Sequence, residues 1–272
     1  MDKFYRWSAK HRWYITIAYN IIFWIPIIIS LLLGALFDFS FYVVYFLLIF
    51  PTSLIFLIYF PKKAIDKAIK KLDANCDPYP LLETVNEQLT YVRLKSFVTV
   101  LQQYKGIALA LTGQYAEALE IACKNNLEAK RTPIPTQIAY CIDLAALYTE
   151  TGDYSSAALC FNKADQLLSL KLSPHVKSSC LIVYNLNFAT YKIYTQQIGE
   201  ASVLVDSIND SNFGVRSLVD LNLLKSRLLI AQNKPQEALP ALRYVINNGN
   251  RLYAVTEARE LLAGIEGVQQ ND

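Results

Sequence analysis

The sequence has little of the side-chain chemistry that enzymes and metal centres use. It contains two histidines, His11 and His175, and its five cysteines include no C-x-x-C pair. It also lacks the Gly-rich phosphate loops, the G-x-S-x-G nucleophile motif and the H-E-x-x-H zinc motif. Histidine is the most frequent metal ligand and acid–base group in proteins. We therefore expect no enzymatic activity, no cofactor and no metal, with the cysteines reduced and serving as small core residues.

Charged residues are absent from two long stretches near the N-terminus. Residues 13–37 and 39–60 are uncharged, and only Asp38 separates them. Each stretch exceeds the roughly 20 residues that a helix needs to cross the hydrocarbon core of a bilayer. The alternative is a cleaved signal peptide, but the first stretch is too long for one and a second stretch follows at once. The pattern predicts two transmembrane helices that form a hairpin.

Basic residues flank this hairpin on both sides and are missing from its turn. Residues 1–12 have a net charge of +3, and residues 61–71 have a net charge of +4. The positive-inside rule then predicts an integral membrane protein with both termini in the cytoplasm. Residues 61–76 are expected to form a basic juxtamembrane helix, which either binds the anionic inner leaflet or only marks the flank of the second span. Its lysines are Lys62, Lys63, Lys67, Lys70 and Lys71.

The rest of the chain, residues 72–272, has a net charge of −3. Nucleic-acid binding needs clustered cations that neutralise phosphates, and this part of the chain does not supply them. The expected partners are therefore the lipid bilayer and another protein or peptide, and not a nucleic acid.

One short pattern recurs along this remaining part. The spacing G-x-Y-x-x-A occurs at residues 113–118 and again at residues 152–157. Two weaker units place Ala201 and Ala238 at the position of the alanine, so that successive alanines are 39, 44 and 37 residues apart. A fixed spacing that returns at such intervals indicates helical hairpins that stack on one another.

The physical chemistry of the second unit agrees with a helical hairpin. Gly152 can adopt the positive φ that ends one helix, and Asp153 can cap the next. Ala157 lacks bulk, so that two helices can approach closely there. Tyr154 and Phe161 are expected to fill the space between the helices.

This pattern resembles that of the tetratricopeptide repeat family over about residues 90–248. The residues that carry the resemblance are Gly106, Gly113, Tyr115 and Ala118 in the first unit, Leu144, Ala145, Tyr148, Gly152, Tyr154, Ala157, Phe161 and Ala164 in the second, and Ala201 and Ala238 in the last two. The resemblance implies antiparallel helix pairs that stack into a right-handed superhelix with a concave groove. We therefore predict an all-α protein in which residues 77–268 form a solenoid of about four helical hairpins, with a tail over residues 269–272.

The last helix is expected to cap this solenoid. Residues 251–265 form an amphipathic pattern in which Leu252, Val255, Leu261 and Leu262 face the stack, while Glu257, Arg259 and Glu260 point outward. Terminal helices with a polar outer face are typical of repeat proteins.

The resemblance also implies where a ligand binds. The first helix of each hairpin faces the groove in that family, and here these helices correspond to about residues 99–112, 138–151, 182–195 and 219–232. The side chains expected to line the groove are Gln103, Ile107, Ile142, Asp143, Ala146, Leu186, Asn187, Thr190, Leu223 and Arg227. Family members that grip acidic peptide C-termini use several Lys, Arg and Asn side chains, and only Asn187 and Arg227 resemble that set. We therefore expect an extended or helical peptide that is held by apolar contacts.

These features together predict a membrane-anchored protein-interaction module. In this interpretation the chain is a scaffold or adaptor that binds a peptide or protein partner in the groove of its cytoplasmic domain. The anchor would raise the local concentration of the binding domain near the membrane. The alternative is an accessory subunit of a membrane transporter or secretion complex, whose hairpin packs against the channel.

Overall fold

The computed structural model describes residues 60–92, 95–125 and 132–269, together with His11, Tyr14, Ile17, Ala18, Ile21 and Trp24. Every regular element in these residues is a helix, which confirms the prediction of an all-α protein for the part of the chain that is described. The two predicted membrane spans, 13–37 and 39–60, lie almost entirely outside it. Among the described residues, no helix combines the length and the apolar character that crossing a bilayer requires.

The chain divides into two units, residues 1–70 with 83–101, and residues 71–82 with 102–272. The helices α3 (Phe60–Asn75), α4 (Tyr79–Tyr91) and α5 (Lys95–Leu111) contribute to the first unit. Within it, Ile65 and Ala68 of α3 are buried, whereas Lys62, Lys63 and Lys70 are exposed. The apolar face of this basic helix is therefore covered by protein, and its lysines remain at the surface.

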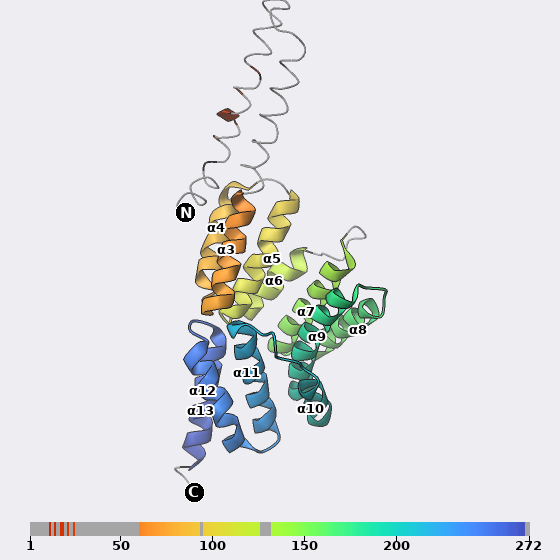
Figure 1. Ribbon diagram of the computed structural model, residues 1–272, viewed down its shortest axis with the longest axis vertical. Helices are drawn as coiled ribbons and strands as arrows, with labels where there is room; N and C mark the ends of the chain where they lie inside the picture. Colours follow the sequence, from red (N-terminus) through yellow and green to blue (C-terminus); the bar gives the residue numbers. More distant parts are fainter. Residues whose placement is uncertain are drawn as a thin grey trace, which may run out of the picture. The chain divides into compact units, whose positions relative to one another are not determined.

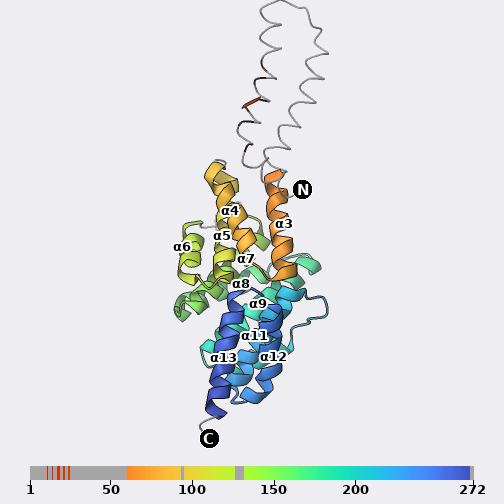
Figure 2. The ribbon, with the colours of Figure 1, turned by 90° about the vertical axis from the view of Figure 1, so that its left-hand side faces the viewer.

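The second unit is a stack of helical hairpins. Its further helices are α6 (Tyr115–Asn125), α7 (Ile134–Glu150), α8 (Tyr154–Leu168), α9 (Pro174–Tyr194), α10 (Ile198–Asp206), α11 (Val215–Ala231), α12 (Pro235–Asn248) and α13 (Tyr253–Gln269). The helices of each pair α7–α8, α9–α10 and α11–α12 pack against each other (Figure 1). The first helices of successive pairs also touch, since α9 contacts both α7 and α11. The helix α13 packs on α12 and closes the stack (Figure 2). This arrangement is solenoid-like.

The four hairpin turns share one backbone geometry. A residue with positive φ follows each first helix, namely Gly113 and Gly152, both at 83°, Gln196 at 61° and Asn233 at 60°. The amide of the next residue donates to the carbonyl five positions earlier, as in the bond of 2.9 Å from Asp153 to Tyr148. This is the Schellman arrangement, which satisfies carbonyls at the end of a helix. Asp153 then caps α8, because its Oδ1 accepts from the amide of Ser156 at 3.1 Å.

The four alanines occupy equivalent places in these hairpins. Ala118, Ala157, Ala201 and Ala238 each lie five residues after the positive-φ residue, and each is 0% exposed. In the second hairpin, Ala157 belongs to a buried cluster that also contains Ala145, Ala164 and Phe161. A side chain of one carbon at this position lets the second helix approach the first closely.

Of the aromatic side chains expected to pack inside the second hairpin, some do and one does not. Phe161 is 1% exposed and packs in a tilted arrangement on Phe188, with ring centroids 4.9 Å apart. Tyr148 is half-buried against the same cluster. The prediction for Tyr154 is wrong, because its side chain is 37% exposed and stacks on Tyr194 at 6.4 Å. Tyr154 is the first residue of α8, and its ring lies against the rings of Tyr191 and Tyr194 of α9.

The capping helix α13 also departs from the expectation in one respect. Leu252 and Val255 are buried as predicted, and Ala258 and Ile265 continue the same face. Glu257, however, does not point outward, because its carboxylate is bound by Arg227 of α11. A carboxylate near an otherwise unpaired internal cation gains more from pairing than from exposure.

Two glycines with the same φ provide a test of the turn geometry. A Cβ at Gly152 meets nothing within 4 Å, whereas a Cβ at Gly113 would lie 2.4 Å from the ring of Tyr253. We expect Gly152→Ala to lower the free energy of unfolding by about 1 kcal/mol, the cost of a left-handed residue with a side chain. Gly113→Ala adds a steric clash and should cost about 2–3 kcal/mol in total. Urea denaturation of the detergent-solubilised full-length chain, followed by circular dichroism, measures both, and equal losses would contradict this reading of the turn.

Candidate functional site

The first helices of the hairpins enclose a cavity of about 430 Å³. Its walls come from α5, α7, α9 and α11, with further residues from α6 and from α13. All of the lining residues belong to the second unit of the chain. A cavity of this size falls in the range of about 300–1,000 Å³ that ligand pockets occupy. It is the concave feature of the described residues that we consider as a binding site.

The structure brings nearly all of the predicted groove residues to this cavity. The residues that line it are Gln103, Ile107, Asp143, Ala146, Leu186, Asn187, Thr190, Leu223 and Arg227. Ile142 does not, because it is 1% exposed and packs in the cluster around Phe161. The helix α7 has one face in the apolar core and another at the cavity, and residues 138, 141, 142 and 145 belong to the core face. Asp143 and Ala146 lie on the cavity face. Each is rotated by about 100° around the helix axis from the core residue that precedes it, Ile142 or Ala145.

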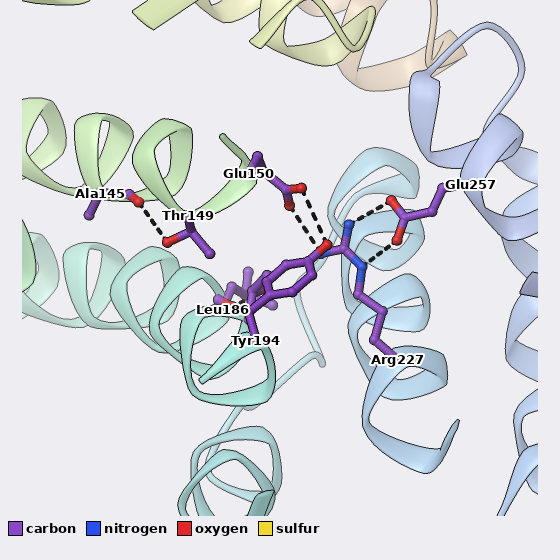
Figure 3. Close-up of polar contacts among 8 residues, drawn as sticks. Ala145, Thr149, Glu150, Leu186, Tyr194, Arg227 and Glu257 are labelled. Carbon is purple, nitrogen blue, oxygen red and sulfur yellow. Dashed lines mark hydrogen bonds and ion pairs between the residues drawn. The ribbon is translucent and has the colours of Figure 1, made fainter. Parts of the chain in front are cut away.

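An ion network joins four helices, and its three charged residues line the cavity (Figure 3). Arg227 of α11 donates to both oxygens of Glu257, from Nε at 2.5 Å and from Nη2 at 2.6 Å. Its Nη1 donates to Glu150 of α7 at 3.2 Å. The hydroxyl of Tyr194 donates to the same Glu150 at 3.4 Å, and the Arg227 guanidinium lies 5.4 Å from the centre of the Tyr194 ring. The two-fold contact with Glu257 is the strongest geometry available to this pair of groups.

Electrostatics in this network follow from burial and from the number of charges. Burial alone would lower the pKa of Arg227, but the hydrogen bonds that Arg227 donates to Glu257 and the two carboxylate charges outweigh it, so that this pKa is raised. Burial raises the pKa of Tyr194 to about 12, and the Glu150 charge adds to the rise. Arg227 is therefore charged at every accessible pH, and Tyr194 keeps its proton. The network is a fixed arrangement and not a source of protons.

Asn187 and Arg227, the two predicted residues that could bind the carboxylate of an acidic peptide, already have partners within the chain. Arg227 is bound to two carboxylates, as described above. The amide of Asn187 donates to the carbonyl of Val183 at 2.8 Å within its own helix. Thr190 is also satisfied internally, since its hydroxyl donates to the carbonyl of Leu186 at 3.1 Å. Thr149 donates in the same way to the carbonyl of Ala145 at 2.7 Å (Figure 3). The cavity therefore offers no free cation of this set to an acidic peptide.

Two further carboxylates line the cavity from α7 and α11. Asp143 and Asp220 are closely surrounded by protein but remain partly accessible from the cavity. Arg216 also lines it, and its Nε donates to Asp73 of α3 at 2.8 Å. Burial raises the pKa of Asp143 to about 7, against the opposing effect of Arg216. Burial also raises the pKa of Asp220, which Arg216 and Arg227 oppose and Asp73 reinforces.

Sequence reasoning missed Glu150, Arg216, Asp220 and Glu257 as cavity residues. A signal for two of them was present, because Glu150 lies seven residues after Asp143, and Asp220 lies seven before Arg227. Residues seven apart share one face of a helix. Polar residues at this interval on mostly apolar first helices therefore mark the cavity face. No comparable signal identifies Glu257, whose partner is thirty residues away.

Chemically, the cavity presents carboxylates, amides and apolar side chains. Among the described residues, no three His, Cys, Asp or Glu side chains are grouped so that they could hold a metal ion. The free cysteines of the described helices, such as Cys141 in the core, are not paired in disulfides. The arrangement is suited to holding a ligand by charge and shape.

Removing the central cation of the network tests how much it stabilises the fold. Arg227→Met leaves Glu150 and Glu257 as buried carboxylates without a counter-ion, and we expect a loss of about 3–5 kcal/mol in the free energy of unfolding. Adding Glu150→Gln and Glu257→Gln to the same chain should recover most of that loss, because no uncompensated charge is then left. Arg243→Met, at an exposed position of α12, is the matched control and should cost little. A triple variant as unstable as Arg227→Met would contradict the charge argument.

The raised pKa of Asp143 makes a pH-dependent prediction. Between the unfolded pKa of about 3.9 and the folded value of about 7, the folded chain holds a proton that the unfolded chain has lost. This carboxyl therefore destabilises the fold as the pH rises through that window. We expect Asp143→Asn to raise the free energy of unfolding by about 2 kcal/mol at pH 8 and by much less at pH 5. Denaturation at both pH values, with the exposed Asp165→Asn as control, measures the difference, and a gain that does not depend on pH would contradict the assignment.

Comparisons of the chain with known protein families, with curated protein sequences and with solved structures find no match. What the cavity does is therefore argued from its own residues.

Proposed function

We propose that this chain is a membrane-anchored protein-interaction module of the tetratricopeptide-repeat type, which holds a segment of a partner protein in the cavity between its first helices. The observation that carries the proposal is the composition of the cavity walls. They come mainly from the first helix of every hairpin, with further residues from α6 and from the capping helix, and the first helices are where stacked hairpins present a concave surface.

The repeat assignment is supported by backbone geometry as well as by sequence. Four turns with positive φ and the same hydrogen-bond pattern are each followed at the fifth residue by a fully buried alanine. Two of these turns use Gln196 and Asn233 in place of glycine. Repeats that differ in sequence and agree in geometry indicate one structural unit used four times.

The membrane anchor is supported by the sequence. The two uncharged stretches at 13–37 and 39–60 are each long enough to span a bilayer, and basic residues flank them on the side assigned to the cytoplasm. Exposed lysines of α3, among them Lys62 and Lys63, directly follow the second stretch. An anchored binding domain increases the effective concentration of any partner that is itself at the membrane. The proposed localisation is a membrane, with the hairpin stack in the cytoplasm.

Blocking the cavity tests the binding half of this proposal. A photoreactive amino acid at Ala146, in the membrane-bound full-length chain, is expected to cross-link to a partner polypeptide, because Ala146 lines the cavity. Ile107→Trp fills the same space and should reduce that adduct about tenfold or more. The same probe at Leu159, which is 71% exposed on α8, serves as the control, and its adducts should not respond to Ile107→Trp.

Two results would contradict the proposal. An Ala146 adduct that is insensitive to Ile107→Trp would remove the cavity as the binding site. A chain that alkaline carbonate releases from membranes would remove the anchor. If the adduct forms only when the native hairpin is present, and is lost with an unrelated two-span anchor, the hairpin itself is a contact surface, as in an accessory subunit.

A further inference from the structure

The cavity has an excess of negative charge. Its walls contain four carboxylates, from Asp143, Glu150, Asp220 and Glu257, and two guanidinium groups, from Arg216 and Arg227. No lysine or histidine of the described residues lines it. Arg227 is committed to Glu150 and Glu257, and Arg216 is hydrogen-bonded to Asp73 outside the walls. Each arginine thus has at least as many carboxylate partners as it can neutralise.

Asp143 and Asp220 are left without a partner of their own. Neither carboxylate forms a hydrogen bond or an ion pair with any described residue, although many side chains surround both. They line the same cavity from two different first helices, α7 and α11, and both lie within the electrostatic influence of Arg216. Ionised carboxylates that are enclosed by protein are unfavourable unless a cation compensates them. Burial raises the pKa of Asp143 to about 7, and the opposing attraction of Arg216 does not offset that rise.

A second orphaned group lies in the same cavity. Asn125, the last residue of α6, lines it, and its Nδ2 is buried without a hydrogen-bond acceptor among the described residues. A buried amide without an acceptor is uncommon and costs about 1–3 kcal/mol. The group that would satisfy it is a carbonyl or another neutral oxygen. The cavity therefore lacks a cation for Asp143 and Asp220 and a hydrogen-bond acceptor for Asn125.

A peptide segment that carries a basic side chain supplies both. Its backbone carbonyls are acceptors, and its lysine or arginine provides the cation. Apolar cavity residues, including Ile107, Ala110 and Leu186, can cover the aliphatic part of such a side chain. A bare metal ion fits less well, because no described group of three ligands is present. A free small amine would leave the Asn125 donor unsatisfied.

We infer that the cavity recognises a partner segment through a lysine or arginine side chain that is placed against Asp143 and Asp220, with Asn125 donating to a backbone carbonyl of that segment. The inference rests on the proposed function and adds the chemistry of the partner to it. The sequence predicts a peptide that is held by apolar contacts. The negative charge of the cavity adds a preference for segments that also carry a basic side chain.

A peptide array tests this directly. The probe is a set of acetylated and amidated nonapeptides with randomised Ala, Leu, Ser and Gln flanks, whose central residue is Lys, Arg, norleucine or Glu. The detergent-solubilised full-length chain, fluorescently labelled, is expected to bind the Lys and Arg peptides about tenfold more tightly than the norleucine peptides, and the Glu peptides least. Asp143→Asn combined with Asp220→Asn should abolish the difference between Lys and norleucine. The control, Asp165→Asn with Asp206→Asn, removes the same charge from exposed positions and should retain it.

The outcomes separate this inference from the proposal on which it rests. Peptides that bind without preference for a basic centre, and lose binding on Ile107→Trp, would overturn the inference and leave the proposed function intact. The absence of peptide binding altogether would count against both. Full competition by n-butylamine, which carries the cation but no carbonyl, at the concentration at which the Lys peptides compete would overturn the peptide assignment in favour of a small amine. Asn125→Ala should weaken the Lys and norleucine peptides alike, and an effect on the Lys peptide only would contradict the role given to the amide.

Discussion

The fold of the hairpin stack depends on one buried cation. Arg227 lies between Glu150 and Glu257, so that a single guanidinium holds the first helices of two hairpins and the capping helix in fixed positions. Tyr194 adds a fourth helix through its ring and its hydroxyl. Apolar packing between neighbouring hairpins is tolerant of small shifts, whereas charges enclosed by protein are not, because a misplaced pair loses its attraction and keeps its desolvation cost. The network therefore ties together α7, α9, α11 and α13, three of which contribute its charged groups to the cavity wall.

The same network decides what the cavity can bind. An arginine on a first helix suggests, from sequence, a contact for an acidic peptide. The structure uses that arginine internally, so the charge that remains for a ligand is the opposite one. Asp143 and Asp220 are then the informative residues, because nothing in the described chain neutralises them fully. Whether a polar residue on a concave surface serves the fold or the ligand depends on its neighbours across the stack, and these neighbours are far away in sequence.

Much of the fold could be predicted because its signals are local. The turn residues, the cap at Asp153 and the small residues such as Ala157 act within one hairpin, and each is visible in a window of about twenty residues. The cavity residues on α7 followed from the resemblance, which places the first helix of each hairpin at the groove, except that Ile142 lies on the adjacent face of the helix and joins the core. Glu257 could not be placed, because its orientation depends on a cation thirty residues earlier. The packing of Tyr154 likewise depends on Tyr191 and Tyr194 of the next hairpin.

The weaker repeats show which constraints the hairpin requires and which it does not. Gln196 and Asn233 adopt positive φ without being glycine, a conformation that costs roughly 1 kcal/mol or more for residues with a Cβ and least for asparagine. The chain keeps the backbone geometry at that cost, and it keeps the alanine five residues later without exception. The geometry of each hairpin is thus specified by the turn and by one small side chain. Residues on the opposite face of each first helix are left free of that requirement. Asp143 and Asp220 lie on that face, and the proposed ligand with a basic side chain would supply the charge that Arg216 alone does not.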